Sequence, residues 1–479
     1  MYQIDGIVIF ESIDYALVPI YFFFIMLFAF AIRNATLRDS PMQKYFIPGL
    51  MVKIAGGLSF GLIYAFYYGG GDTFYYYWDS KAFNMALGDG LTQFYRLLTL
   101  PAGEITIYTS KYTSWICYFR DPAGWMADKV YGIISIFTLH SYWAMTIVMA
   151  TLSFSGAWAL YRTFYKLYPQ LNQQLAYCVL FVPSVFFWGS GVLKDSITFG
   201  CLGWITYSSY QIFFRQKNVI GNLIIILITA YIAIEVKAYI IISFLPALLF
   251  WIFLTYRSRI QLQFIRVISG PAVIVMSLVF GYLLVGKLGE EFSKFSLQNV
   301  VSTSQNYQIW HSYLAETSHA SGYSLGTIDG SWQSIVKAFP RAVTVTLFQP
   351  FLWQAHSIVI LLSAFESTFI LGFTLYILYK NGLKRTLAAI IGNPNVFFCF
   401  FYSIIFAFSV GLTAYNFGAL VRYKIPCMPF FLMGLVILNH LTAVDRKKRE
   451  QEAGQHRVKK QMGRAIQRKP QLAFGKLPS

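Results

Sequence analysis

The stretch YALVPIYFFFIMLFAFAI, residues 15–32, contains no charged side chain. A helix of this length rises about 27 Å, close to the ~30 Å hydrocarbon thickness of a bilayer. Arg33 follows directly, so the apolar run ends at a cation. This stretch predicts a membrane-spanning helix. If further stretches of this kind follow, the chain is a helical membrane protein.

The composition of the whole chain agrees with that prediction. Of 479 residues, 57% are hydrophobic and only 12% are charged, against roughly 25% charged in a soluble domain. Apolar runs of spanning length predict an all-α, polytopic transmembrane helix bundle with about eleven spans. The expected spans are 15–32, 47–68, 142–162, 173–190, 196–214, 219–234, 238–256, 266–286, 356–379, 394–413 and 424–441.

The distribution of Lys and Arg predicts the orientation. The first 32 residues contain neither, whereas basic clusters follow alternate spans, at 33–44, 162–166, 215–217, 257–259 and 380–385. Short loops rich in Lys and Arg stay in the cytoplasm. We therefore expect an N-terminus outside the membrane, a bundle over 1–445 with outer loops 69–141 and 287–355, and a cytoplasmic tail over 446–479.

Half of the net charge of +18 lies in that tail, which has eleven Lys or Arg and two Glu. We expect it to lie against anionic lipid headgroups and not to bind nucleic acid, because no nucleic-acid-binding motif accompanies it. The five cysteines are scattered without metal-ligand spacing, so they are interpreted as small apolar residues.

The first outer loop is not a polar tether. GLTQFYRLLTL, residues 90–100, places apolar side chains on one helical face, and residues 130–137 are nearly as apolar. These stretches predict interfacial helices that lie in the headgroup plane and enclose a cavity at the membrane surface.

The same loop opens with GGGDTFYYYWDSKAF, residues 69–83. Asp72 and Asp79 are two helical turns apart and would share one face. They could act as catalytic groups, one of them as a base toward a hydroxyl, or hold Mg²⁺ or Mn²⁺ through carboxylate oxygens. Tyr76 and Trp78 could bind a sugar face, although an aromatic belt at the interface explains them as well.

Three tight outer corners carry further charges. GSGVLKDS, residues 189–196, places Lys194 at the outer headgroup level, where it could contact a phosphate. Glu235 and Lys237 bracket the corner IEVKAY and could bind an acceptor. Arg422 begins the last span, and its guanidinium suits a bidentate phosphate contact. Simple surface pairs at turns are the alternative for all of these corners.

The second outer loop is rich in hydroxyls, amides and aromatics over residues 305–332. His311 and His319 are candidate acceptor or sugar ligands there, and an external loop without a site is the alternative. The spacing does not match a zinc helix. Arg341 lies beside Pro340 at the outer edge.

The chain resembles the GT-C superfamily of membrane glycosyltransferases. ALVRYKIPCMPFFLMG, residues 419–434, is similar to the RYxxPxxPF endings of its bacterial members. FVPSVFFWGSGVLKDS (181–196) and TLFQPFLWQAH (346–356) are similar to segments of multispanning proteins from bacterial surface-glycan loci. In that family the acid usually follows the first span and belongs to an acidic dyad. Here Asp72 follows the second span, and no dyad is present.

The resemblance implies transfer of a sugar from a polyprenyl-phosphate or polyprenyl-diphosphate carrier to a glycan, lipid or protein acceptor, on the noncytoplasmic face of a bacterial inner membrane. Asp72 would be the base, and Lys194, Arg341 and Arg422 would hold the carrier phosphate. Two alternatives stay open. An O-antigen-type polymerase or ligase would depend on Arg and His of the second loop. A lipid-linked glycan transporter or flippase would need charges near mid-membrane, where Glu366 lies.

Overall fold

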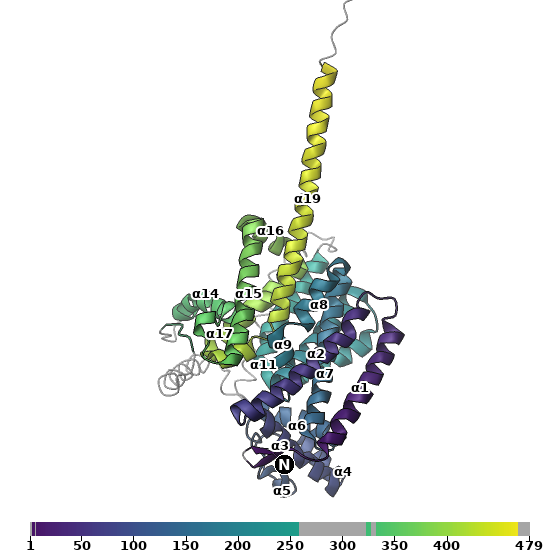
Figure 1. The fold of residues 1–479 in the computed structure, drawn as a ribbon, viewed down its shortest axis with the longest axis vertical. Helices are drawn as coiled ribbons and strands as arrows, with labels where there is room; N and C mark the ends of the chain where they lie inside the picture. Colours follow the sequence, from purple (N-terminus) through teal and green to yellow (C-terminus); the bar gives the residue numbers. More distant parts are fainter. Residues whose placement is uncertain (1, 5, 258–321, 327–331, 468–479) are drawn as a thin grey trace, which may run out of the picture.

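The computed structural model describes residues 2–4, 6–257, 322–326 and 332–467. It is a bundle of helices with a group of short helices at one end and one long helix, α19, leaving the other end (Figure 1). One hairpin of two strands, β1 (Tyr2–Ile4) and β2 (Ile7–Phe10), precedes the first helix.

Seven helices in the described ranges are long and apolar enough to cross a membrane. Many of their apolar side chains face outward, including Phe28 (64% exposed) and Phe369 (70% exposed). Such faces are stable against lipid and unfavourable in water, so the predicted helical membrane bundle is confirmed. The seven are α1 (Asp14–Thr36), α2 (Gln43–Ile63, continued by the π-helical turn η1, Tyr64–Tyr68), α7 (Tyr142–Leu167), α11 (Val219–Arg257), α15 (Ile358–Asn381), α17 (Pro394–Ala414) and α19 (Met428–Gln467).

The predicted number of eleven spans is not confirmed. The run 173–190 is divided into α8 (Asn172–Leu180) and α9 (Pro183–Trp188), each far too short to cross a bilayer. The run 196–214 forms α10 (Lys194–Tyr210) and the turn η3 (Gln211–Arg215). The span expected at 266–286 lies outside the described residues.

The two spans expected at 219–234 and 238–256 are both in α11, which doubles back at Lys237. Lys237 has non-helical backbone angles, with φ −153° and ψ 76°. Asn222 bonds to the backbone just after η3, Lys237 reaches the start of α10, and Trp251 returns to Phe214 in η3, with 4.6 Å between ring centroids. The first arm of α11 therefore runs antiparallel to α10, and the second arm runs back beside it.

Residues 69–141 fold into a helical layer at one end of the bundle, the lower end of Figure 1. The layer contains α3 (Asp72–Asp89), α4 (Leu91–Thr99), α5 (Ser110–Thr113) and α6 (Pro122–Phe137). It has a hydrophobic cluster of its own that includes Phe83, Leu97 and Trp125. On the apolar face of α4, Phe94, Leu97 and Leu98 pack into this cluster, whereas Leu91 is exposed. The apolar stripe of α4 thus packs mainly against protein.

Part of the second outer segment enters the bundle. Helix α14 (Trp332–Phe348) packs antiparallel to α17, and the hydroxyl of Thr346 donates to the carbonyl of Ala407 at 2.8 Å. The chain then turns through η5 (Leu352–Gln354) into α15. Two short helices complete the described fold: α16 (Leu383–Gly392) links α15 to α17, and α18 (Phe417–Tyr423) precedes α19.

Glycines set the closest helix crossing, between α7 and α10. A Cβ atom on Gly156 would lie 2.1 Å from the carbonyl oxygen of Gly200, and one on Gly203 would lie 2.0 Å from that of Gly156. Small residues at such crossings let two backbones touch in an apolar surround. This crossing fixes α10, and with it the polar residues at the start of α10.

Candidate functional site

The three corners that were predicted to lie on the outer side are far apart in the sequence, but they meet at one place, where the helical layer joins the bundle. Asp72 begins α3 directly after three glycines with positive φ angles of 67°, 158° and 139°. Gly71 is required there, since a Cβ atom would lie 2.5 Å from the ring of Tyr64. The glycine turn therefore delivers Asp72 to the mouth of the bundle.

Asp195 is the centre of this cluster. It lies in the first turn of α10, its side chain is 1% exposed, and its two oxygens bind two cations. Oδ1 pairs with Nζ of Lys237 at the reversal of α11, and Oδ2 accepts from Nε of Arg422 in α18 at 2.6 Å. A buried carboxylate held by two cations makes a rigid platform for both of them.

Arg422 connects this buried pair to the surface. Its Nη1 lies 3.3 Å from Oδ2 of Asp72, and the hydroxyl of Tyr118 donates to the other oxygen of Asp72 at 3.1 Å. The side chain of Asp72 is 47% exposed, whereas that of Arg422 is 14% exposed. We call Asp72, Asp195, Lys237 and Arg422 the outer charge cluster, after the side of the membrane that the distribution of Lys and Arg predicts for them. Asp72 is its accessible acid.

A second ion pair lies near this cluster. Lys194 donates to Oδ2 of Asp121 at 3.0 Å, and its ammonium lies 5.9 Å from the ring centre of Tyr76 and 5.7 Å from that of Tyr118. Asp121 also caps α6 by accepting from the amide of Gly124. Lys194 is thus held over two tyrosine rings, close to the tyrosine that contacts Asp72.

Asp79 has a different environment from Asp72. It is fully buried, and its two oxygens accept from the amides of Cys117 and Tyr118 at 3.0 and 3.1 Å. Burial raises the pKa of Asp79 to about 6, and the two amide donors oppose the rise. Asp79 therefore anchors the loop before α6. Tyr118 links the two acids, because its amide donates to Asp79 and its hydroxyl donates to Asp72. No group of three or more His, Cys, Asp or Glu within the described residues could hold a metal ion.

Asp128 in α6 is a buried acid that was not predicted from the sequence. It is fully buried, and neither carboxylate oxygen has a hydrogen-bond partner among the described residues. Burial, followed by the charge of Asp79, holds the pKa of Asp128 well above its usual range. The sequence does not show that Asp128 is buried, because polar and apolar residues do not alternate regularly along α6.

The remaining predicted site residues lie in several places. Tyr76 is buried and stacks on Tyr118 at 4.8 Å, while Trp78 packs edge-on against Trp115 at 5.7 Å. Glu235 lies close enough to Lys129 to raise the pKa of that lysine against the larger lowering effect of burial. His311 and His319 lie outside the described residues. The structure thus brings together Asp72, Lys237 and Arg422, with Lys194 close by.

Arg341 lines a separate cavity of about 560 Å³. The lining includes Tyr323, Thr344 and Gln349, and the buried Oε1 of Gln349 has no hydrogen-bond partner among the described residues. The carbonyl of Gln349 accepts from Nζ of the buried Lys424 at 3.0 Å. Lys424 follows Arg422 by two residues, so Gln349, which lines this cavity, contacts the chain at the end of α18.

Two charges lie at the ends of the half-helix α9, the partly buried Glu366 and the fully buried Lys53. Glu366 of α15 accepts from the amide and hydroxyl of Ser184 at 2.7 and 2.6 Å, at the start of α9. Lys53 of α2 donates to the carbonyls of Val185 and Gly189 at 3.2 and 2.8 Å, at its end. An acid at the N-terminus and a cation at the C-terminus both complement the helix dipole. The sequence did carry a signal for this role of Lys53, because it is the only lysine inside the apolar run 47–68.

Comparison with known proteins identifies no relative: no family model, no curated protein and no solved structure matches the chain.

Proposed function

We propose that the chain is a GT-C-type membrane glycosyltransferase that moves a sugar from a polyprenyl-linked donor to an acceptor on the noncytoplasmic face of a bacterial inner membrane. The observation that carries this proposal is the outer charge cluster. It combines one half-exposed carboxylate, Asp72, with a guanidinium that is held from behind by a buried acid.

Arg422 supplies the contact for the donor phosphate. Its Nε is engaged by the buried Asp195 at 2.6 Å, whereas its contact to the half-exposed Asp72 is longer, at 3.3 Å. An incoming phosphate would compete with Asp72 for Nη1 and leave the bond to Asp195 intact. Lys194 lies over the ring of Tyr118, the tyrosine that contacts Asp72, and adds a second positive charge. Fixed cations of this kind stabilise the charge that develops on a leaving phosphate.

Asp72 supplies the base. Once the phosphate occupies Nη1 of Arg422, the carboxylate of Asp72 is free to take the proton of an acceptor hydroxyl. The hydroxyl oxygen then forms its bond to the anomeric carbon as the bond from that carbon to the carrier phosphate breaks. A single displacement inverts the anomeric centre.

The test is transfer by the purified full chain, with polyprenyl-linked sugars extracted from host membranes and products followed by mass spectrometry. We expect Asp72→Asn to lower the transfer rate by about 10²–10⁴-fold, the usual contribution of a general base. Asp89→Asn is the matched control, because Asp89 is an exposed acid at the other end of α3. Each reaction is repeated with a chelator, because Asp72 and phosphate oxygens are ligand types that Mg²⁺ takes.

Full activity of Asp72→Asn would overturn the base assignment. If Arg341→Ala then lost transfer, the polymerase or ligase function would take its place, with the cavity beside Tyr323 as the glycan site.

A transporter or flippase is favoured by a different observation, the partly buried Glu366 and the buried Lys53 at the two ends of α9. Broken helices with charged partners at their ends form binding sites in many transporters. Absence of product from every donor, together with movement of labelled lipid-linked glycan across vesicles that contain the protein, would favour this alternative.

A further inference from the structure

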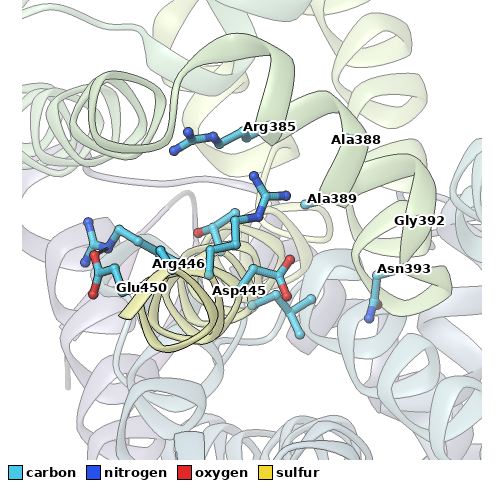
Figure 2. A pocket seen from close by; sticks show the side chains of 12 residues that line it. Arg385, Ala388, Ala389, Gly392, Asn393, Asp445, Arg446 and Glu450 are labelled. Carbon is cyan, nitrogen blue, oxygen red and sulfur yellow. Dashed lines mark ion pairs between the residues drawn. The ribbon is translucent and has the colours of Figure 1, made fainter. Parts of the chain in front are cut away.

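A second charged cavity lies at the end of the bundle opposite the outer charge cluster. It has a volume of about 680 Å³ and is formed by α16, the turn after it, and the part of α19 that leaves the bundle. Figure 2 shows Arg385 on the α16 side, with Asp445, Arg446 and Glu450 on α19 across from it. Volumes of this size are typical of sites for small molecules.

Three arginines from two elements line this cavity: Arg385, Arg446 and Arg449. Arg446 lies 4.0 Å from Glu450, a pair that is exposed on both sides. Within the described residues, no ion pair is found for Arg385 or Arg449. Guanidinium groups on facing elements can both donate to the oxygens of one phosphate.

The surface of α16 indicates where this cavity lies relative to the membrane. Leu383, Leu387 and Ile391 are four residues apart on one face and are 66%, 49% and 72% exposed. Lys384 and Arg385 follow Leu383 in the sequence and place positive charge beside this stripe. An exposed apolar stripe beside basic residues is typical of a helix that lies in the headgroup region. The mouth of the cavity is therefore at the level of lipid phosphates.

We propose that this cavity binds the phosphodiester headgroup of a phospholipid, with Arg385 and Arg449 contacting the phosphate oxygens. A lipid fits better than a soluble phosphate, because the exposed stripe of α16 would contact its acyl chains while the arginines contact its headgroup. This assignment does not depend on the proposed transferase activity, since the cavity lies at the opposite end of the bundle from Asp72.

The test is a titration of the delipidated full chain in detergent with phosphatidylglycerol, followed by native mass spectrometry of bound lipid. The variant Arg385→Gln/Arg449→Gln should bind phosphatidylglycerol about 25-fold more weakly, at about fivefold for each basic contact. The matched control is Lys447→Gln/Lys448→Gln. It removes the same charge from exposed positions of α19 that do not line the cavity, and it should change the affinity by less than about twofold.

Equal weakening by the two double variants would show diffuse attraction to the basic end of α19, and the proposal would be wrong. Competition by inorganic phosphate at the concentration of the lipid would also overturn it, in favour of a soluble anion. Thermal midpoints of both double variants are measured in the same detergent, and a variant with a lowered midpoint is replaced by the single change Arg385→Gln.

Discussion

Asp195 balances the charges of Lys237 and Arg422 in a place that water hardly reaches. Replacing Asp195 by Asn leaves Lys237 buried without a counter-charge and leaves Arg422 with only the half-exposed Asp72. We therefore expect the free energy of unfolding to fall by about 3–5 kcal/mol. Asp72→Asn removes a half-exposed partner of Arg422 and should cost about 1 kcal/mol or less. Thermal unfolding in detergent compares the two variants, and similar midpoints would contradict the central role of Asp195.

Asp128 has a raised pKa, so the folded protein binds its proton more tightly than the unfolded chain does. The associated stability is complete below the unfolded pKa of about 4, and it is lost as the pH rises toward the folded pKa. Asp128→Asn removes this loss. We expect the variant to unfold at a higher temperature than wild type at pH 7.5 and to show no such gain at pH 3.5.

A gain in thermal stability at pH 7.5 but not at pH 3.5 would identify Asp128 as a buried carboxyl whose ionisation destabilises the fold. A variant that was equally destabilised at both pH values would instead mean that Asp128 makes a hydrogen bond in solution, for example to a bound water.

Several residues of the candidate site could be predicted because they share one property. Asp72, Lys194, Lys237 and Arg422 are charges at the ends of apolar runs, where an unpaired ion is unfavourable. Asp195 has the same position, but its neighbour Lys194 offered an obvious partner within the turn. In the structure these two neighbours point to different partners, Asp121 and the pair of Lys237 and Arg422. Adjacency in sequence does not report on side-chain direction.

At the scale of elements, the contact between α7 and α10 depends on glycine. Gly203→Ala would place a methyl group 2.0 Å from a backbone oxygen, so the two helices must separate. We expect a loss of about 1–3 kcal/mol, as for other overpacked cores. Gly372→Ala in α15 is the control. It meets no atom within 4 Å and should be neutral or slightly stabilising, because alanine favours helix. Thermal unfolding of the two variants decides the point, and equal midpoints would contradict the close crossing.

Five long helices, α1, α2, α7, α15 and α17, were predicted well because each is a single apolar run that ends in polar residues. The break between α8 and α9 is marked by Pro183, but what stabilises the break is not local. Its partners are Lys53 and Glu366, which come from helices before and after it in the chain. In the same way, Lys237 looked like a loop residue, and its partner in α10 explains why α11 reverses there. The periodicity of apolar residues cannot predict which distant residues bind the ends of a broken helix.

At the scale of the whole molecule, the helical layer and the basic part of α19 lie at opposite ends of the bundle (Figure 1). Because short segments rich in Lys and Arg stay in the cytoplasm, we expect the helical layer to lie outside the membrane. In intact cells, a membrane-impermeant maleimide should label Ile107→Cys in the layer, where the side chain is 93% exposed. It should label Lys448→Cys only after permeabilisation.

The background for this experiment is Cys117→Ser, because Cys117 is exposed and the other four cysteines are buried. Labelling of Lys448→Cys in intact cells would reverse the orientation, and the candidate transferase site would then face the cytoplasm.

The outer charge cluster also has a consequence for biosynthesis. Lys237 is synthesised 42 residues after Asp195, but Arg422 is synthesised 227 residues after it. At about 5–20 residues per second, the ribosome needs roughly 10–45 s to reach Arg422. During that time the first arm of α11 already delivers Lys237 to Asp195, so the carboxylate has a counter-ion while later helices are still being inserted. Arg422 can then bind Asp195 as the second cation, and the carboxylate of Asp195 is never without a counter-ion in the membrane.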